Sequence, residues 1–269
     1  MNYEQANSKL TEYGQEHVLK YYEELNDEQK QLLLEQVEDI DFSVLKYVNE
    51  EHKMKKGKIT PLAAMQLSQI KEKEEEFKSI GLEAIKAGKV GAVLLAGGMG
   101  TRLGSDDPKG MYNIGITKDV YIFQRLIENL LDIVNMADAW IPLYVMTSDK
   151  NHEATTRFLK EHDYFGYKSE YITFFMQEMA PACDYEGKVY LEEKWKISTS
   201  PNGNGGWYSS MHKWGIAQKA MEDGVEWLNV FAVDNVLQRI ADPCFVGAVM
   251  ANDCAAGSKV VRKCAPDEK

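Results

Sequence analysis

A glycine-rich stretch followed by two cations is the part of this sequence best suited to chemistry. Three glycines fall within positions 97–100, one residue after the apolar run 90–95. Glycine permits a sharp turn and lets main-chain N–H groups approach a ligand closely. Arg102 and Lys109 add two positive charges just beyond the turn. A strand that runs into a glycine turn with paired cations predicts a site for an oligophosphate.

Two common phosphate-binding motifs do not fit this stretch. The dinucleotide fingerprint G-x-G-x-x-G requires glycine where Leu103 stands, and Gly104 comes one residue late. The P-loop motif requires serine or threonine after its lysine, whereas Gly110 follows Lys109. An ordinary turn between a strand and a helix is the alternative interpretation. The defined offsets of the two cations favour the phosphate site.

A carboxylate after another apolar run is a candidate metal ligand. Asp234 directly follows the run 228–233. Mg²⁺ prefers carboxylate oxygens combined with substrate phosphates, so a carboxylate at a strand end beside a phosphate loop is well placed to hold it. A helix N-cap is an equally common role for aspartate after a strand. The residues alone leave both interpretations open.

The elements that must position these groups alternate between strands and helices. Apolar patterns predict strands at 90–95, 141–146, 172–176 and 228–233, and helices at 121–134 and 153–161. This alternation predicts an α/β fold with a Rossmann-like, mostly parallel sheet covered by helices on both faces. Ligands bind at the carboxyl ends of strands in such sheets. That rule selects the loop 97–102, Ser148, Gln177 and Asp234.

Residues 1–89 are expected to form a helical N-terminal segment, and 90–269 a nucleotide-binding α/β catalytic domain. Asn26 or Asp27 can cap a helix whose apolar positions are Leu32, Leu33, Val37 and Ile40. Thr60 and Pro61 are expected to open a second helix. The charged run 71–76 is typical of a solvated helix face. Gly88 is expected to end the last helix before the first strand.

The composition excludes several classes of protein. The 269 residues carry a formal net charge of -11, with a pI near 5.1, which argues against a nucleic-acid or membrane-surface binder. No apolar run approaches transmembrane length. The first residues, 1–4, have no basic or apolar signal region, so no secretory signal is expected. The four cysteines show no C-x-x-C pair and read as reduced thiols. We therefore expect a cytoplasmic protein without nucleic-acid or membrane partners.

The glycine-rich stretch resembles a known signature. The residues L-A-G-G-M-G-T-R-L-G at 95–104, with P-K-G at 108–110, are similar to the nucleotide-binding signature of the eukaryotic-type UDP-sugar pyrophosphorylases. That family has a glycosyltransferase-A-like fold. Further matches lie at 146–148, 164–166, 174–177, 191–194 and 241–243. The resemblance implies these nucleotide-binding residues: Leu95, Ala96, Gly97, Gly98, Gly100, Thr101, Gln177, Gly203, Asn204 and Ala232.

A second loop is informative about which sugar the protein binds. The residues P-N-G-N-G-G at 201–206 match the N-acetylhexosamine branch of the family, whereas the glucose branch carries P-P-G-H-G-D. The resemblance implies that Gly203 lies against the uridine, that Asn204 reaches the sugar and that Gln177 contacts the uracil. A plain surface turn and a polar strand end are the alternatives. After this glutamine the family commonly has glycine, whereas this chain has Glu178.

The reaction that the resemblance implies is uridylyl transfer. UTP and N-acetylglucosamine 1-phosphate would give UDP-N-acetylglucosamine and pyrophosphate, without a covalent enzyme intermediate. Arg102 and Lys109 would be the catalytic residues that bind the triphosphate, and Asp234 would hold Mg²⁺. One alternative is glucose 1-phosphate as the sugar substrate. The other is a nucleotide-binding fragment without turnover.

Members of the family continue well past the position that matches Lys269. We therefore expect a C-terminally truncated chain with an incomplete sheet and much of the sugar pocket missing. The run 259–263 is expected to be a further strand. An open sheet edge of this kind predicts self-association.

Overall fold

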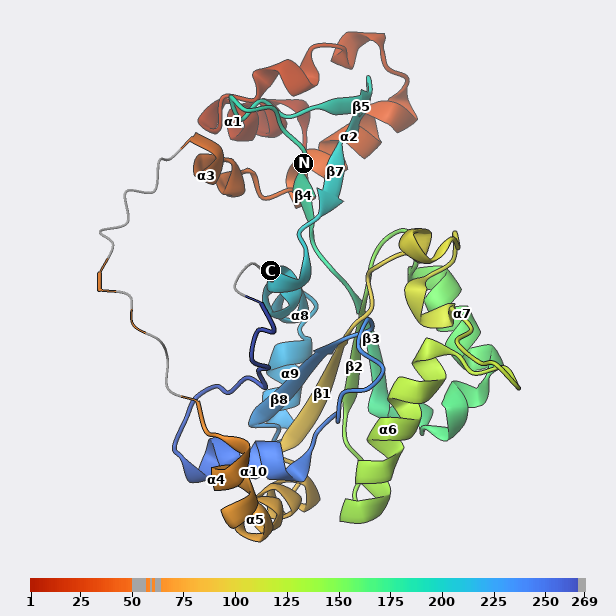
Figure 1. The fold of residues 1–269 in the computed structure, drawn as a ribbon. Coiled ribbons are helices and arrows are strands. Elements are labelled where there is room, and N and C mark those ends of the chain that lie inside the picture. The colour runs from red at the N-terminus through yellow and green to blue at the C-terminus, as the bar shows by residue number, and fades with distance from the viewer. Residues whose placement is uncertain (50–56, 59, 61–63, 266–269) are drawn as a thin grey trace. The chain divides into compact units, whose positions relative to one another are not determined.

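The computed structural model describes residues 1–49, 57, 58, 60 and 64–265. Internal contacts define two compact units, Met1–Leu62 with Gln177–Ser209 and Ala63–Met176 with Ser210–Lys269 (Figure 1). These units differ from the predicted division at residue 89, because α5 (Glu74–Lys86) packs along α10 (Pro243–Ala251) within the second unit. The contact is close: a Cβ added to Gly247 would lie 1.8 Å from the carbonyl oxygen of Phe77.

A parallel sheet forms the centre of the second unit. Its strands are β1 (Val90–Leu95), β2 (Leu143–Thr147), β3 (Ile172–Met176) and β8 (Trp227–Ala232). They lie in the order β3-β2-β1-β8, and every neighbouring pair is parallel. The predicted α/β architecture is confirmed. The second and fourth strands are displaced by one or two residues from their predicted bounds, which lie at 141–146 and 228–233.

Helices bury the sheet on both faces. The remaining helices of this unit are α4 (Leu67–Glu72), α6 (Ile122–Ala137), α7 (His152–Glu161), α9 (Ile216–Glu222) and, across the division between the units, α8 (Trp207–Lys213). Phe123 and Leu126 of α6 join Leu94 and Val145 of the sheet in one buried cluster. Figure 1 shows α9 on the other side of the sheet from α6. All six residues of β1 are buried, as a central parallel strand requires.

The first unit combines helices with short antiparallel strand pairs. Its elements are α1 (Tyr3–Glu12), α2 (Asp27–Asp39), α3 (Lys46–Asn49), β4 (Met179–Pro181), β5 (Leu191–Glu193), β6 (Lys196–Ile197) and β7 (Thr199–Pro201). β4 pairs with β7, and β5 with β6. Leu10, Leu33 and Phe42 from the helices share a core with Val189 and Ile197 from the strand segment. Two distant parts of the chain therefore fold together here.

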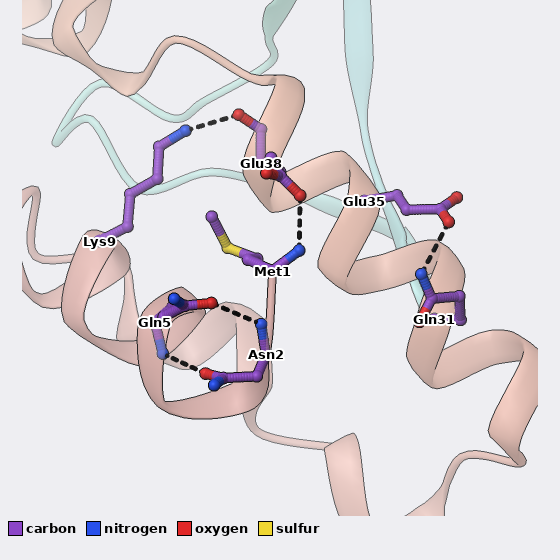
Figure 2. Close-up of polar contacts among 7 residues, drawn as sticks. All are labelled: Met1, Asn2, Gln5, Lys9, Gln31, Glu35 and Glu38. Carbon is purple, nitrogen blue, oxygen red and sulfur yellow. Dashed lines mark hydrogen bonds and ion pairs between the residues drawn. The ribbon is translucent and has the colours of Figure 1, made fainter.

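Polar contacts hold the N-terminus against α2 (Figure 2). The amino group of Met1 forms an ion pair of 2.5 Å with the Glu38 carboxylate. Lys9 Nζ donates to the Glu38 carbonyl oxygen over 2.9 Å. Asn2 and Gln5 cap α1 reciprocally, each accepting a 2.9 Å hydrogen bond from the other's backbone N–H. The start of the chain is thus an ordered part of the first unit.

Most predictions for residues 1–89 hold in the described part. Asn26 caps α2, and its side chain accepts from the N–H of Gln29. Of the apolar positions named for this helix, Leu33 and Val37 are buried, whereas Leu32 lies outside that face and is exposed. The run 71–76 is exposed throughout, as predicted. The predicted helix start at Pro61 lies outside the described residues.

The predicted strand at 259–263 is wrong. These residues have no regular structure, and Val260 and Val261 are exposed. Lys259 instead pairs with Asp242 over 2.8 Å at the start of α10. Two valines between charged residues have no buried surface to pack against here, so the β propensity of valine has no effect. Among the described residues, none of the helices combines the length and the apolar character that a membrane-spanning segment needs.

Candidate nucleotide-binding site

The strand order identifies one place where a ligand site is expected. From β1 the chain continues to β2 on one side, and it later returns to β8 on the other side of β1. In open α/β sheets, ligands bind at such a reversal, outside the carboxyl ends of the strands. Leu95 pairs with Ala232, and the Val233 N–H donates to the Leu95 carbonyl oxygen over 3.1 Å. The glycine loop and Asp234 therefore leave the sheet from neighbouring strand ends.

Lys109 and Asp234 form an ion pair at this position. They are 125 residues apart in the chain, and each was predicted separately as a site residue. The Lys109 side chain is 17% exposed and the Asp234 side chain 60% exposed, so the carboxylate remains accessible to a ligand. The N-cap interpretation of Asp234 is wrong, because the next helix begins at Pro243 and is capped by Asp242.

The glycine loop is folded back on itself. The Gly100 N–H donates to the Asp107 carbonyl oxygen over 2.8 Å, and the Lys109 N–H donates to the Gly98 carbonyl oxygen over 3.2 Å. These bonds set Lys109 beside the glycines. Arg102 lies in a short 3-10 turn, Thr101–Leu103, and is exposed. Its guanidinium makes no hydrogen bond or ion pair with another residue that the structure describes, so it is free to bind an anion.

Several main-chain N–H groups of the loop are also available. Across the described parts of the chain, no hydrogen-bond acceptor is present for the N–H groups of Gly97, Gly98, Thr101 and Arg102. Successive N–H groups of this kind form a concave site for anions. The predicted residues Leu95, Ala96, Gly97, Gly98, Gly100, Thr101, Arg102, Lys109, Ala232 and Asp234 all lie in the second unit, and the geometry suits a nucleotide phosphate.

The remaining predicted residues lie together in the first unit. Gln177 is buried at the end of β3, and Gly203 precedes the 3-10 turn Asn204–Gly206. The Asn202 N–H donates to the Glu178 carbonyl oxygen over 3.0 Å. Glu178 also accepts from the Ser209 hydroxyl over 2.7 Å. Glu178, which stands where the family usually has glycine, thus connects the end of β3 to the second loop by hydrogen bonds.

Sequence analysis did not single out Asn151, which contacts the glycine loop. This side chain is fully buried between β2 and α7, and its amide donates to the Ala96 carbonyl oxygen over 2.9 Å. An asparagine just before a helix is commonly a cap. The local pattern therefore gave no signal that distinguished Asn151 from an ordinary cap.

Close packing against a core side chain explains why position 110, the last residue of P-K-G, is glycine. A Cβ at this position would lie 2.2 Å from the ring of the buried Phe123. We expect Gly110→Ala to lower the free energy of unfolding by about 1–3 kcal/mol, because the core must shift to admit the methyl group. Urea denaturation measures this. Gly98→Ala is the matched stability control, because open space surrounds that position. Equal unfolding midpoints for the two variants would contradict the prediction.

The fold defines an α/β protein with a parallel sheet whose glycine loop lies at the reversal of the strand order. The family described as UTP–glucose-1-phosphate uridylyltransferase matches residues 35–269. The chain belongs to this family.

Named relatives and a solved structure agree with the resemblance. The chain is 36% identical, over 97% of its length, to UDP-N-acetylglucosamine diphosphorylase 2 of Arabidopsis thaliana, of which it covers 56%. It is 42% identical, over 71% of its length, to UDP-N-acetylglucosamine pyrophosphorylase of Saccharomyces cerevisiae, of which it covers 41%.

The crystal structure of uridine diphosphate N-acetylglucosamine pyrophosphorylase from Trypanosoma brucei superposes with a TM-score of 0.80 at 26% identity, covering 91% of this chain and 54% of that one. The predicted fold class is thereby confirmed. The chain spans about half the length of curated relatives such as the two Arabidopsis proteins, at 56% and 55%.

Proposed function

We propose that this chain carries the nucleotide site of a uridylyltransferase that converts UTP and N-acetylglucosamine 1-phosphate into UDP-N-acetylglucosamine and pyrophosphate. The observation that carries the proposal is the ion pair of Lys109 with Asp234 beside the glycine loop. A cation and a carboxylate at the carboxyl ends of neighbouring strands suit a nucleotide triphosphate and its metal ion. The names of the relatives support the sugar.

The reaction needs positioning and charge neutralisation rather than a nucleophilic side chain. A phosphate oxygen of the sugar phosphate attacks the α-phosphorus of UTP, and the bond to the leaving pyrophosphate breaks. Arg102 and Lys109 bind the triphosphate and stabilise the charge that develops on it. The free N–H groups of Gly97 and Gly98 add further donors. Ligand binding would require Lys109 to leave Asp234 and turn to a phosphate.

Asp234 is the residue proposed to hold Mg²⁺. Magnesium sites that use substrate phosphates need only one or two carboxylates from the protein, so a single exposed carboxylate fits this ion. Mg²⁺, when bound, would neutralise phosphate charge. Release of Lys109 would free the carboxylate for the metal.

We assign the binding of the uridine and the sugar to residues at strand ends and to residues in the loop 201–206. The Gln177 amide can pair with the donor and acceptor groups of uracil. Gly203 is assigned to the uridine and Asn204 to the sugar. Leu95, Ala96 and Ala232 are assigned to the nucleoside, and their place at the carboxyl ends of β1 and β8 supports this assignment. Glucose 1-phosphate is the second candidate sugar, favoured by the name of the family to which the chain belongs.

Pyrophosphate release tests the proposal. The chain is supplied with UTP and Mg²⁺, and N-acetylglucosamine 1-phosphate and glucose 1-phosphate are assayed in parallel. We expect release with the N-acetylated sugar. Release with glucose 1-phosphate alone would move the proposal to the second sugar. Binding of UTP without release would leave the alternative of a nucleotide-binding fragment, and absence of UTP binding by folded protein would contradict the whole proposal.

Two further proposals concern the self-association of the protein and its cellular location. β8 has a partner on only one side among the described strands, which supports self-association through that edge. Sedimentation at several protein concentrations tests it. A cytoplasmic location stays a proposal that rests on composition.

A further inference from the structure

Asn151 connects two elements that meet at the proposed site. Its side chain is 0% exposed. The amide nitrogen donates to the Ala96 carbonyl oxygen over 2.9 Å and, less closely, to the Gly98 carbonyl oxygen over 3.4 Å. The amide oxygen accepts from the Ser148 N–H over 2.8 Å. One buried side chain thus joins the turn after β2 to the beginning of the glycine loop.

This arrangement is not the usual one for an asparagine at a helix start. Asn151 stands at the N-cap position of α7, yet its side chain makes no capping hydrogen bond to that helix. A capping role alone would direct the side-chain oxygen to the first turn of α7. The amide instead donates to the backbone that follows β1, at Ala96 and Gly98. The helix therefore does not account for the contacts of this residue.

The contacts bear on the direction of the loop N–H groups. The carbonyl of Ala96 and the N–H of Gly97 belong to the same planar trans peptide, so they point in opposite directions. Holding the Ala96 oxygen against Asn151 turns the Gly97 N–H away from the protein interior. The same reasoning relates the Gly98 oxygen to the N–H of Met99. The Gly97 N–H has no acceptor among the residues that the structure describes.

We propose that Asn151 is a positioning residue that presents the loop N–H groups to the nucleotide. The inference rests on the proposed function, since it assumes that the glycine loop binds UTP. A buried amide with both its polar ends bonded holds a single orientation, because any other orientation would leave a buried polar group unpaired. The loop is thereby set before the ligand arrives, and binding does not have to order it.

Two variants of the full chain test this role. Asn151→Asp keeps an oxygen for the Ser148 N–H and places an acceptor, rather than a donor, against the Ala96 oxygen. Asn151→Ala removes the amide without adding charge, and it decides the matter if Asn151→Asp does not fold. We expect isothermal titration with UTP and Mg²⁺ to show affinity weakened by about tenfold or more for each folded variant, as loss of a buried hydrogen bond predicts.

A matched control separates positioning from stability. Asn129→Ala removes an asparagine that accepts from the Ile240 N–H over 2.9 Å, and in the described chain Asn129 forms no hydrogen bond with the glycine loop. We expect this control to unfold at a lower temperature but to bind UTP as the unaltered chain does. In ¹⁵N NMR spectra, UTP should shift the Gly97 amide signal in the control and shift it much less in the Asn151 variants.

The outcomes distinguish this inference from the proposed function. Failure of the unaltered chain to bind UTP would overturn the proposed function and this inference with it. Tight binding by the unaltered chain and equally tight binding by a folded Asn151 variant would overturn the positioning role alone. Weakened binding by the Asn129→Ala control to the same degree would also overturn it, because the effect would then follow stability.

Discussion

Arg102→Ala is expected to lower the turnover of uridylyl transfer by about two to three orders of magnitude, as loss of one charge-stabilising donor generally does. The guanidinium is exposed beside the glycine loop, and it pairs with no other group in the described parts of the protein. Its removal should therefore leave the free energy of unfolding within about 0.5 kcal/mol of the original value. Steady-state pyrophosphate release measures the turnover, and urea denaturation measures the stability.

Arg125→Ala is the matched control for this experiment. Arg125 is an exposed arginine on α6 that pairs with Glu128 over 2.6 Å, on the same helix. We expect its removal to leave turnover unchanged. If the chain binds UTP without turnover, Arg102→Ala should instead weaken UTP binding at least about tenfold, because a charged contact to phosphate is lost. Normal turnover and normal affinity in Arg102→Ala would rule out the assigned role.

Asp234→Asn is expected to lower turnover by about a hundredfold or more and to raise the Mg²⁺ concentration needed for half-maximal rate. An amide has no charge, so it is a much weaker ligand for Mg²⁺ than a carboxylate. The substitution also removes the partner of Lys109, but the Asp234 side chain is 60% exposed. Ion pairs with such exposure contribute little to stability, so the protein should remain folded.

Titration of the rate with Mg²⁺ distinguishes a metal ligand from a simple ion-pair partner. Asp223→Asn is the control, because Asp223 forms an exposed pair of 2.8 Å with Lys219 on the surface of the same unit. The control should keep the original Mg²⁺ dependence. An unchanged Mg²⁺ dependence in Asp234→Asn, with turnover close to normal, would show that Asp234 does not bind the metal.

Local patterns in the sequence were enough to predict the four strands of the parallel sheet and to single out the glycine loop. The run 90–95 is apolar throughout because β1 is buried on both faces, and such a run is visible without any tertiary information. The glycines and cations of 97–109 stand close together in the chain. Asp234 was predicted for the same reason, since it directly follows the apolar run 228–233 and lies two residues after the end of β8. Site residues can be predicted from the sequence where adjacent positions in the chain indicate their role.

Local patterns were misleading where a distant partner decides the structure. The run 259–263 has two β-branched residues, but strand formation needs a neighbouring strand, and none pairs with this run in the described chain. The division at residue 89 followed the change from helices to strands. The contact of α5 with α10, which joins residues more than 150 apart, was invisible to that reasoning.

The class of fold, the family signature and most of the candidate site residues could be predicted from the amino-acid sequence alone. Only the tertiary structure brought Lys109 to Asp234, because the pairing of β1 with β8 sets their separation in space and not in the chain. The tertiary structure also showed that Asn151, which no local pattern singled out, contacts the glycine loop. Asn151 follows β2, and β2 lies beside β1 in the sheet. The buried amide of Asn151 needs a hydrogen-bond acceptor, and the backbone that follows β1 provides one.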